Sequence, residues 1–183
     1  MLKPTPDVLH RLSHRLYWRG LILPARISQA LIFLIFSALL RAEVAIGKRT
    51  RYGHGGVAVV LSSNSTTGGH ILIAPSHTIG GRSRQTRFPV VEVDVYIGAG
   101  AMIVGELVIG HHSIVGANAV VLPSVPAHSV AVRVPARVVR AGIDPFEFED
   151  RWGRFSVFRS WALNVLPTAG WEGLLYLREA VGA

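Results

Sequence analysis

A histidine, His54, lies inside the glycine-rich stretch "RYGHGGVAVVLSSNS" at residues 51–65. The ordinary pKa of imidazole is close to neutral, so histidine is the natural general base for taking a proton from a hydroxyl group. The chain contains no cysteine, which excludes a cysteine nucleophile, a thiolate metal site and disulfide bonds. The candidate chemistry is therefore proton abstraction by His54, and the next question is which elements position it.

A repeat of six residues runs through the second half of the chain. Aliphatic residues recur at this spacing: Ile97, Ile103, Ile109, Val115 and Val121. A helix would give a period near 3.6 and a simple strand a period of 2, so neither explains the pattern. The repeat predicts a triangular β-solenoid, in which six residues form one short strand and one corner, and 18 residues form a coil.

The same repeat extends back to Ile46, less regularly, and is interrupted twice. Three extra residues separate Tyr52 from Leu61, which predicts that the corner with His54 bulges outward. Residues 82–90 carry arginines and no inward aliphatic residue, which predicts a loop extending from a corner.

Helices are expected on both sides of the solenoid. We predict an N-terminal helical segment at 1–43, a solenoid domain at 44–140 and an aromatic helical extension at 141–183. The individual helices are expected at 6–19, from Pro24 to about Leu40, at 146–165 and at 170–181. The apolar run at 27–40 is shorter than the roughly 20 residues of a spanning helix. It is expected to be buried at a subunit interface or to lie on a membrane surface.

The charge balance predicts an anionic partner. The net charge is +8, which suits a nucleotide cofactor, a lipid headgroup or a nucleic acid. No secretory signal pattern opens the chain, so we expect a cytoplasmic protein with the N-terminal helices as candidates for peripheral membrane contact. Nucleic acid is not an expected partner. No metal is expected either, because no HExxH spacing occurs and the solenoid does not need a metal.

The stretch "VYIGAGAMIVGELVIGHHSIVGANAVVLPSVPAHSVAVRVPARVVR" resembles the hexapeptide-repeat acyltransferases. Within them the chain is most similar to serine acetyltransferases and to exopolysaccharide (colanic-acid type) O-acetyltransferases. The resemblance covers residues 44–140 and implies a mainly β fold, a left-handed parallel β-helix. It also implies a homotrimer with active sites between subunits, and acetyl-CoA as the acyl donor.

The resemblance implies roles for particular residues. His54 matches the family's catalytic base, whereas Ser62 stands where other members carry a histidine. Leu39 replaces the aspartate that orients the base, and Glu43 from a neighbouring subunit is our candidate substitute. Phe88 replaces a second family histidine.

The repeat also predicts a cofactor groove. Residues 18 apart should stack along the solenoid, and one such series consists of small residues: Gly81, Ala99, Ala117 and Pro135. A column of small residues leaves room for an extended pantetheine arm. Arg137 and Arg140 are candidates for contacts to the nucleotide phosphates. Ser62, His77 and Arg87 are our candidates for contacts to the acceptor.

Three functions remain open at this point. The main expectation is an acetyl-CoA-dependent O-acetyltransferase acting on a sugar, a polysaccharide precursor or a small hydroxylated metabolite. The alternatives are a serine O-acetyltransferase and a non-catalytic trimeric scaffold.

Overall fold

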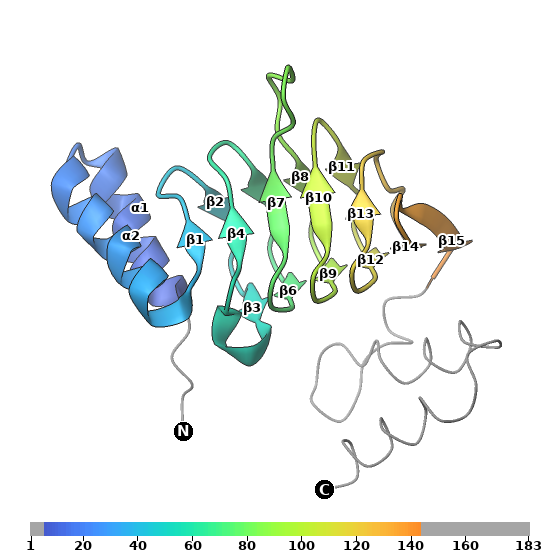
Figure 1. Ribbon diagram of the computed structural model, residues 1–183, viewed down its shortest axis with the longest axis horizontal. Helices are drawn as coiled ribbons and strands as arrows, with labels where there is room; N and C mark the ends of the chain where they lie inside the picture. The colour runs from blue at the N-terminus through green and yellow to red at the C-terminus, as the bar shows by residue number, and fades with distance from the viewer. Residues whose placement is uncertain (1–5, 144–183) are drawn as a thin grey trace, which may run out of the picture. The chain divides into compact units, whose positions relative to one another are not determined.

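Two packed helices precede the solenoid in the computed structural model, which describes residues 6–143 (Figure 1). α1 (Pro6–Trp18) and α2 (Ile22–Phe36) form a hairpin. Pro24 lies in the first turn of α2, where its missing N–H group costs no hydrogen bond. α2 ends four residues earlier than predicted, because Ser37 adopts a left-handed conformation (φ 50°) and Leu39–Leu40 already form the first strand.

Short strands stack into three sheets that form the sides of a prism (Figure 1). The first sheet contains β1 (Leu39–Leu40), β4 (Val60–Leu61), β7 (Thr78–Gly80), β10 (Met102–Val104) and β13 (Val120–Val121). The second contains β2 (Ala45–Ile46), β5 (Thr66–Thr67), β8 (Val90–Val91) and β11 (Val108–Ile109). The third contains β3 (Arg51–Tyr52), β6 (Leu72–Ile73), β9 (Tyr96–Ile97), β12 (Ile114–Val115), β14 (Ser129–Val132) and β15 (Arg137–Ala141). Pairing is parallel except between β14 and β15.

The residues of the six-residue repeat fill the inside of the prism, so the predicted parallel β-solenoid is confirmed. Ile73, Ile79, Ile97, Ile103 and Ile109 are each 0% exposed. Their side chains alternate with outward ones along each strand, as a pleated strand requires.

The three sheets are joined at three corners, and the candidate site residues lie at these corners. The first corner links the first sheet to the second and contains 41–44, 62–65, 81–89 and 105–107. The second corner links the second sheet to the third and contains 47–50, 68–71, 92–95 and 110–113. The third corner links the third sheet to the first and contains 53–59, 74–77, 98–101 and 116–119.

Both predicted interruptions lie at corners. The three extra residues are accommodated by a short turn, η1 (Gly53–Gly56), at the third corner. The arginine-rich loop extends from the first corner between β7 and β8 (Figure 1). The helices predicted at 146–165 and 170–181 lie outside the described residues.

Candidate active site

His54 lies in η1, at the third corner. Its backbone is left-handed (φ 49°, ψ 35°), as is that of Gly55 (φ 75°). Other corner residues, among them His70 and Asn118, have similar positive φ values. The conformation of His54 therefore belongs to the way this solenoid turns its corners and does not by itself mark a catalytic residue.

The helical hairpin holds η1 in place. A side chain at Gly56 would come within 2.8 Å of Pro6 Cγ, so the start of α1 packs directly on the turn. At the other side, Ala58 donates its backbone N–H to Phe36 O at 3.3 Å, at the end of α2. The N-terminal helices thus fix the turn that carries the candidate base.

The His54 side chain is exposed and has no hydrogen-bond partner among residues 6–143. Beneath it, Tyr52 points into the core, and burial raises the pKa of its phenol. Tyr52 therefore keeps its proton and contributes to the packing of the core. The imidazole of His54 is free to accept a proton from a bound molecule.

A column of small residues rises from His54 along the same corner. A Cβ atom added at Gly53 would lie 3.7 Å from Pro75 Cδ, so Gly53 packs against Pro75. The next coils follow directly, because Gly100 N donates to Pro75 O at 3.1 Å and Asn118 N donates to Ala99 O at 2.8 Å. Pro75, Ala99 and Ala117 therefore stack above the His54 turn along the third corner.

Two of the four residues predicted for the small-residue column, Gly81 and Pro135, do not lie in it. Ile79 pairs with Ile103, so the coil with the loop takes 24 residues where the coil from Leu61 to Ile79 takes 18. Gly81 consequently lies at the first corner, packed under the Phe88 ring, and not below Ala99. Pro135 is displaced because Val115 pairs with Ala131, only 16 residues on, which puts Arg133 after Ala117.

The other first-corner candidates lie at the far ends of the first-sheet strands from His54. Glu43 forms an ion pair with Arg41 (3.6 Å), and its Oε2 is buried without a hydrogen bond. Ser62 donates its hydroxyl to Ile79 O at 3.2 Å. Arg87, in the loop, donates to Glu106 at 3.1 Å. Within one chain, none of these groups is beside His54.

His77 is not available to an acceptor, which corrects the sequence prediction. Its side chain points into the prism and is 0% exposed. Nδ1 donates to Ala74 O at 2.8 Å, and Nε2 has no partner. Burial lowers the pKa of His77 to about 4, so the ring is neutral at pH 7.

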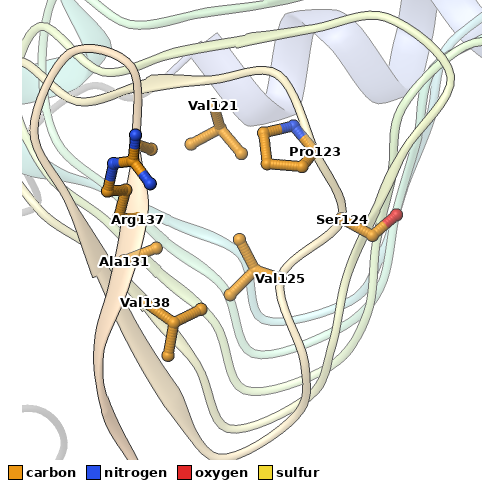
Figure 2. Close-up of a pocket in the computed structure, with 8 residues that line it drawn as sticks. Val121, Pro123, Ser124, Val125, Ala131, Arg137 and Val138 are labelled. Carbon is orange, nitrogen blue, oxygen red and sulfur yellow. The ribbon is translucent and has the colours of Figure 1, made fainter.

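The C-terminal end of the solenoid contains an apolar pocket of about 400 Å³ (Figure 2). Val121, Val125 and Ala131 line it, and Arg137 lies at its rim. Arg140 follows on the same strand, β15. The pocket is the open end of the last coil and lies at the other end of the prism from His54, so it is not the reaction centre.

Two histidines at the second corner, His111 and His128, are hydrogen-bonded. His111 donates through Nδ1 to Glu92 Oε2 at 2.9 Å, and this hydrogen bond lowers the pKa of Glu92. His128 donates through Nδ1 to Ile143 O at 3.1 Å. No group of three metal-ligating side chains in residues 6–143 is arranged to hold a metal ion.

Sequence comparison finds serine acetyltransferases. The chain is 32% identical over 145 residues to the serine acetyltransferase of Synechococcus elongatus, covering 76% of this chain and 59% of that protein. The chain thus spans about three-fifths of the length of the curated relatives it matches. No family model matches the chain.

Solved structures give the same result. The serine acetyltransferase of Brucella abortus in complex with coenzyme A superposes with a TM-score of 0.72 at 30% identity, over 75% of this chain and 56% of that one. Soybean serine acetyltransferase in complex with serine gives 0.69 at 32% identity, over 73% and 56%. The similarity includes the solenoid that carries His54.

Proposed function

The chain belongs to the hexapeptide-repeat acyltransferase superfamily and is serine acetyltransferase-like. We propose that it is an acetyl-CoA-dependent O-acetyltransferase. One observation carries the proposal: an exposed, unpaired imidazole stands at the foot of a column of small residues on the same corner. A base at one end and an open groove leading away from it are what transfer from an extended thioester donor requires.

In the proposed reaction, His54 takes the proton of the acceptor hydroxyl as its oxygen attacks the thioester carbonyl. The C–S bond then breaks, and the protonated imidazole returns the proton to the departing thiolate. The base acts in both directions, so it must be able to gain and lose a proton near neutral pH.

The proposed donor groove follows the corner from His54 past Ala99 and Ala117. Coils are stacked about 4.8 Å apart, so four steps from the His54 turn to Arg133 span about 19 Å. Arg133, at that far end, adds a cation to the predicted phosphate contacts of Arg137 and Arg140. The relative solved with coenzyme A supports acetyl-CoA as the donor.

Serine is the acceptor that the relatives favour, since both curated relatives and solved structures are named serine acetyltransferases. A sugar-type acceptor stays a second candidate because of two positions. Leu39, which replaces the acid that orients the base in the serine enzymes, presents an apolar side chain that is 45% exposed. Phe88, which replaces a family histidine, packs on Gly81.

An acceptor screen tests the proposal. Free thiol release from acetyl-CoA is followed with L-serine and with a panel of sugars, for the full chain and for His54→Ala. We expect release that depends on the acceptor and is lost in the variant. Binding of CoA without transfer to any hydroxyl acceptor would contradict the enzyme and favour the scaffold.

We also propose that the complete site needs two subunits, as in a homotrimer. The third corner carries the base and the small-residue column, whereas Glu43, Ser62 and Arg87 lie at the first corner. A neighbour that brings its first corner to the His54 turn would unite the two groups.

Mixed assemblies test this arrangement. A His54→Ala chain is co-assembled with a chain in which residues 82–87 are replaced by two glycines. Each alone should be inactive, whereas the mixture should regain about a quarter of the sites, those where two intact corners meet. No recovery in mixed assemblies would place the whole site within one subunit.

A further inference from the structure

The outward side of α2 is apolar and exposed. Beyond Ile22 at its start, six large hydrophobic side chains of the helix are between 42% and 75% exposed: Leu23, Ile27, Leu31, Phe33, Leu34 and Ile35. We call these six residues the outer face of α2. Single exposed hydrophobic residues are ordinary, but six on one 15-residue helix form a continuous apolar surface.

The inner side of the same helix is already used. Ile32 and Phe36 belong to the hydrophobic core. Ser28 donates to Pro24 O at 3.0 Å, and Ser13 of α1 donates to Ala25 O at 2.9 Å. The inner side of α2 is therefore the side that packs on the protein, and its serine is hydrogen-bonded there. The outer face is a second apolar side of the same helix.

The hairpin is also anchored to the solenoid. His10 donates to Arg41 O at 3.2 Å and His14 donates to Ala42 O at 2.6 Å, both at the first corner. These bonds join α1 to the body of the protein. The outer face of α2 is consequently presented in a fixed direction.

The same helical hairpin carries exposed positive charge. Arg15, Arg19 and Arg26 are exposed. The acid in residues 6–36, Asp7, is paired with Arg11 at 3.0 Å. Trp18, 68% exposed, lies at the end of α1 between the arginines, and tryptophan is enriched at the boundary between lipid and water.

These features distinguish between three possible occupants. A bilayer-spanning role is excluded for the described part, since no helix in residues 6–143 is long and apolar enough to cross a membrane. A second copy of the chain would bring the two sets of arginines together at a partly apolar contact, where like charges repel. A surface of anionic lipid offers both an apolar layer for the outer face and negative charge for the arginines.

We propose that the outer face of α2, with Arg15, Arg19 and Arg26, docks the protein on an anionic membrane surface. α2 would lie in the plane of the interface, with its six apolar side chains below the headgroups and the arginines among the phosphates. The proposal does not depend on the acetyltransferase activity.

Flotation with lipid vesicles tests the docking. The full chain is mixed with vesicles of phosphatidylcholine alone or with phosphatidylglycerol added. We expect flotation with the anionic vesicles that weakens as salt is raised. Leu23→Glu/Leu34→Glu should weaken the apparent affinity by about tenfold or more, since two apolar side chains are withdrawn from lipid. Arg19→Gln/Arg26→Gln should weaken it by about fivefold for each arginine.

Matched variants on the solenoid serve as controls. Val93→Glu/Val108→Glu adds the same two acids at exposed positions, and Arg49→Gln/Arg51→Gln removes the same charge. Both should lose clearly less affinity than their partners on the helices. Circular dichroism spectra and unfolding midpoints, unchanged in every variant, report the fold without any use of CoA, which keeps this test separate from the proposed function.

Three results would overturn the proposal. The first is no flotation of the full chain with anionic vesicles. The second is equal loss of binding in helix and solenoid variants, which would leave only general charge attraction. The third is a fall in the mass measured by light scattering in Leu23→Glu/Leu34→Glu without vesicles, which would assign the face to a second copy.

Discussion

The second and third corners of the prism both carry histidines, and these histidines differ in their exposure and hydrogen bonding. At the third corner, His54 is exposed and has no hydrogen-bond partner in the described residues. At the second corner, His111 and His128 donate to Glu92 and to Ile143 O, and their rings lie 5.1 Å apart. The difference shows that a histidine at a corner is common in this chain, while an exposed one without a hydrogen-bond partner is unusual among residues 6–143.

The contrast has a structural origin. The second corner repeats coil after coil without an insertion, so its side chains stack on one another and find partners. The third corner has three extra residues before Leu61, and these carry His54 away from the stack. An inserted turn thus separates one imidazole from neighbours that would otherwise satisfy its nitrogens.

The largest expected effect comes from His54→Ala. Removal of the general base should lower the rate of acetyl transfer by about a hundredfold or more. CoA affinity should change little, because the column of small residues is untouched. Steady-state rates of thiol release and calorimetric CoA binding measure the two effects separately.

His111→Ala is the matched control, since it removes an imidazole from the paired corner. Its transfer rate should stay within about twofold of the original, a change too small for a lost base. If His111→Ala lost as much activity as His54→Ala, the distinction between free and paired histidines would be wrong.

The second prediction uses His77, which is neither free nor paired with an acid. Its pKa is about 4 in the folded protein and 6.5 in an unfolded chain, so between these values the unfolded state binds more protons. The ring imposes no penalty above pH 6.5, and stability falls as pH drops from 6.5 towards 4. The full loss is about 3 kcal/mol.

Denaturant unfolding of the protein and of His77→Leu between pH 7 and pH 4 measures this contribution. The variant carries no titrating ring at that position, so the stability difference between the two chains should shift in its favour on acidification. A difference that stays constant over the range would show that His77 titrates normally.

A third prediction tests the column above His54. Ala117→Trp places a large ring on the corner two coils beyond Pro75, and it should raise KM for acetyl-CoA by about tenfold, close to 1.4 kcal/mol. Val93→Trp, at the second corner, is the control and should leave KM unchanged. An unchanged KM in Ala117→Trp would move the donor groove to another edge.

The six-residue repeat was enough to predict the solenoid. A helix or a simple strand does not place an aliphatic side chain at every sixth residue, whereas each side of a three-sided prism does. Residues such as Ile97 and Ile103 lie where the period puts them. The end of α2 was misjudged because Leu39 and Leu40 continue the apolar run, while the left-handed turn at Ser37 leaves no pattern in hydrophobicity.

The site was harder to predict, since spacing along the chain does not reveal which corner a residue occupies. The loop adds six residues, so a period of 18 joined Gly81 to Ala99 across two different corners. Counting the loop as an insertion would have found Pro75 as the member below Ala99. The burial of His77 follows the same rule, because it stands at an inward position of the repeat that Ala101 and Ala119 occupy in later coils.

The smallest expected effect lies at the second corner, in Glu92→Gln. The hydrogen bond from His111 lowers the pKa of Glu92, so the carboxylate stabilises the fold above its unfolded pKa of 4.5, and this stabilisation is lost as pH falls further. The carboxylate is 43% exposed, so water screens the pair and the loss at pH 7 should be below about 1 kcal/mol. Urea unfolding at pH 7 and pH 3 should show a small difference between the chains at pH 7 and a smaller one at pH 3. Acetyl transfer should be unaffected, because the paired histidines hold their corner together and take no part at the third one. A tenfold loss of transfer with unchanged stability would connect the two corners and break the comparison.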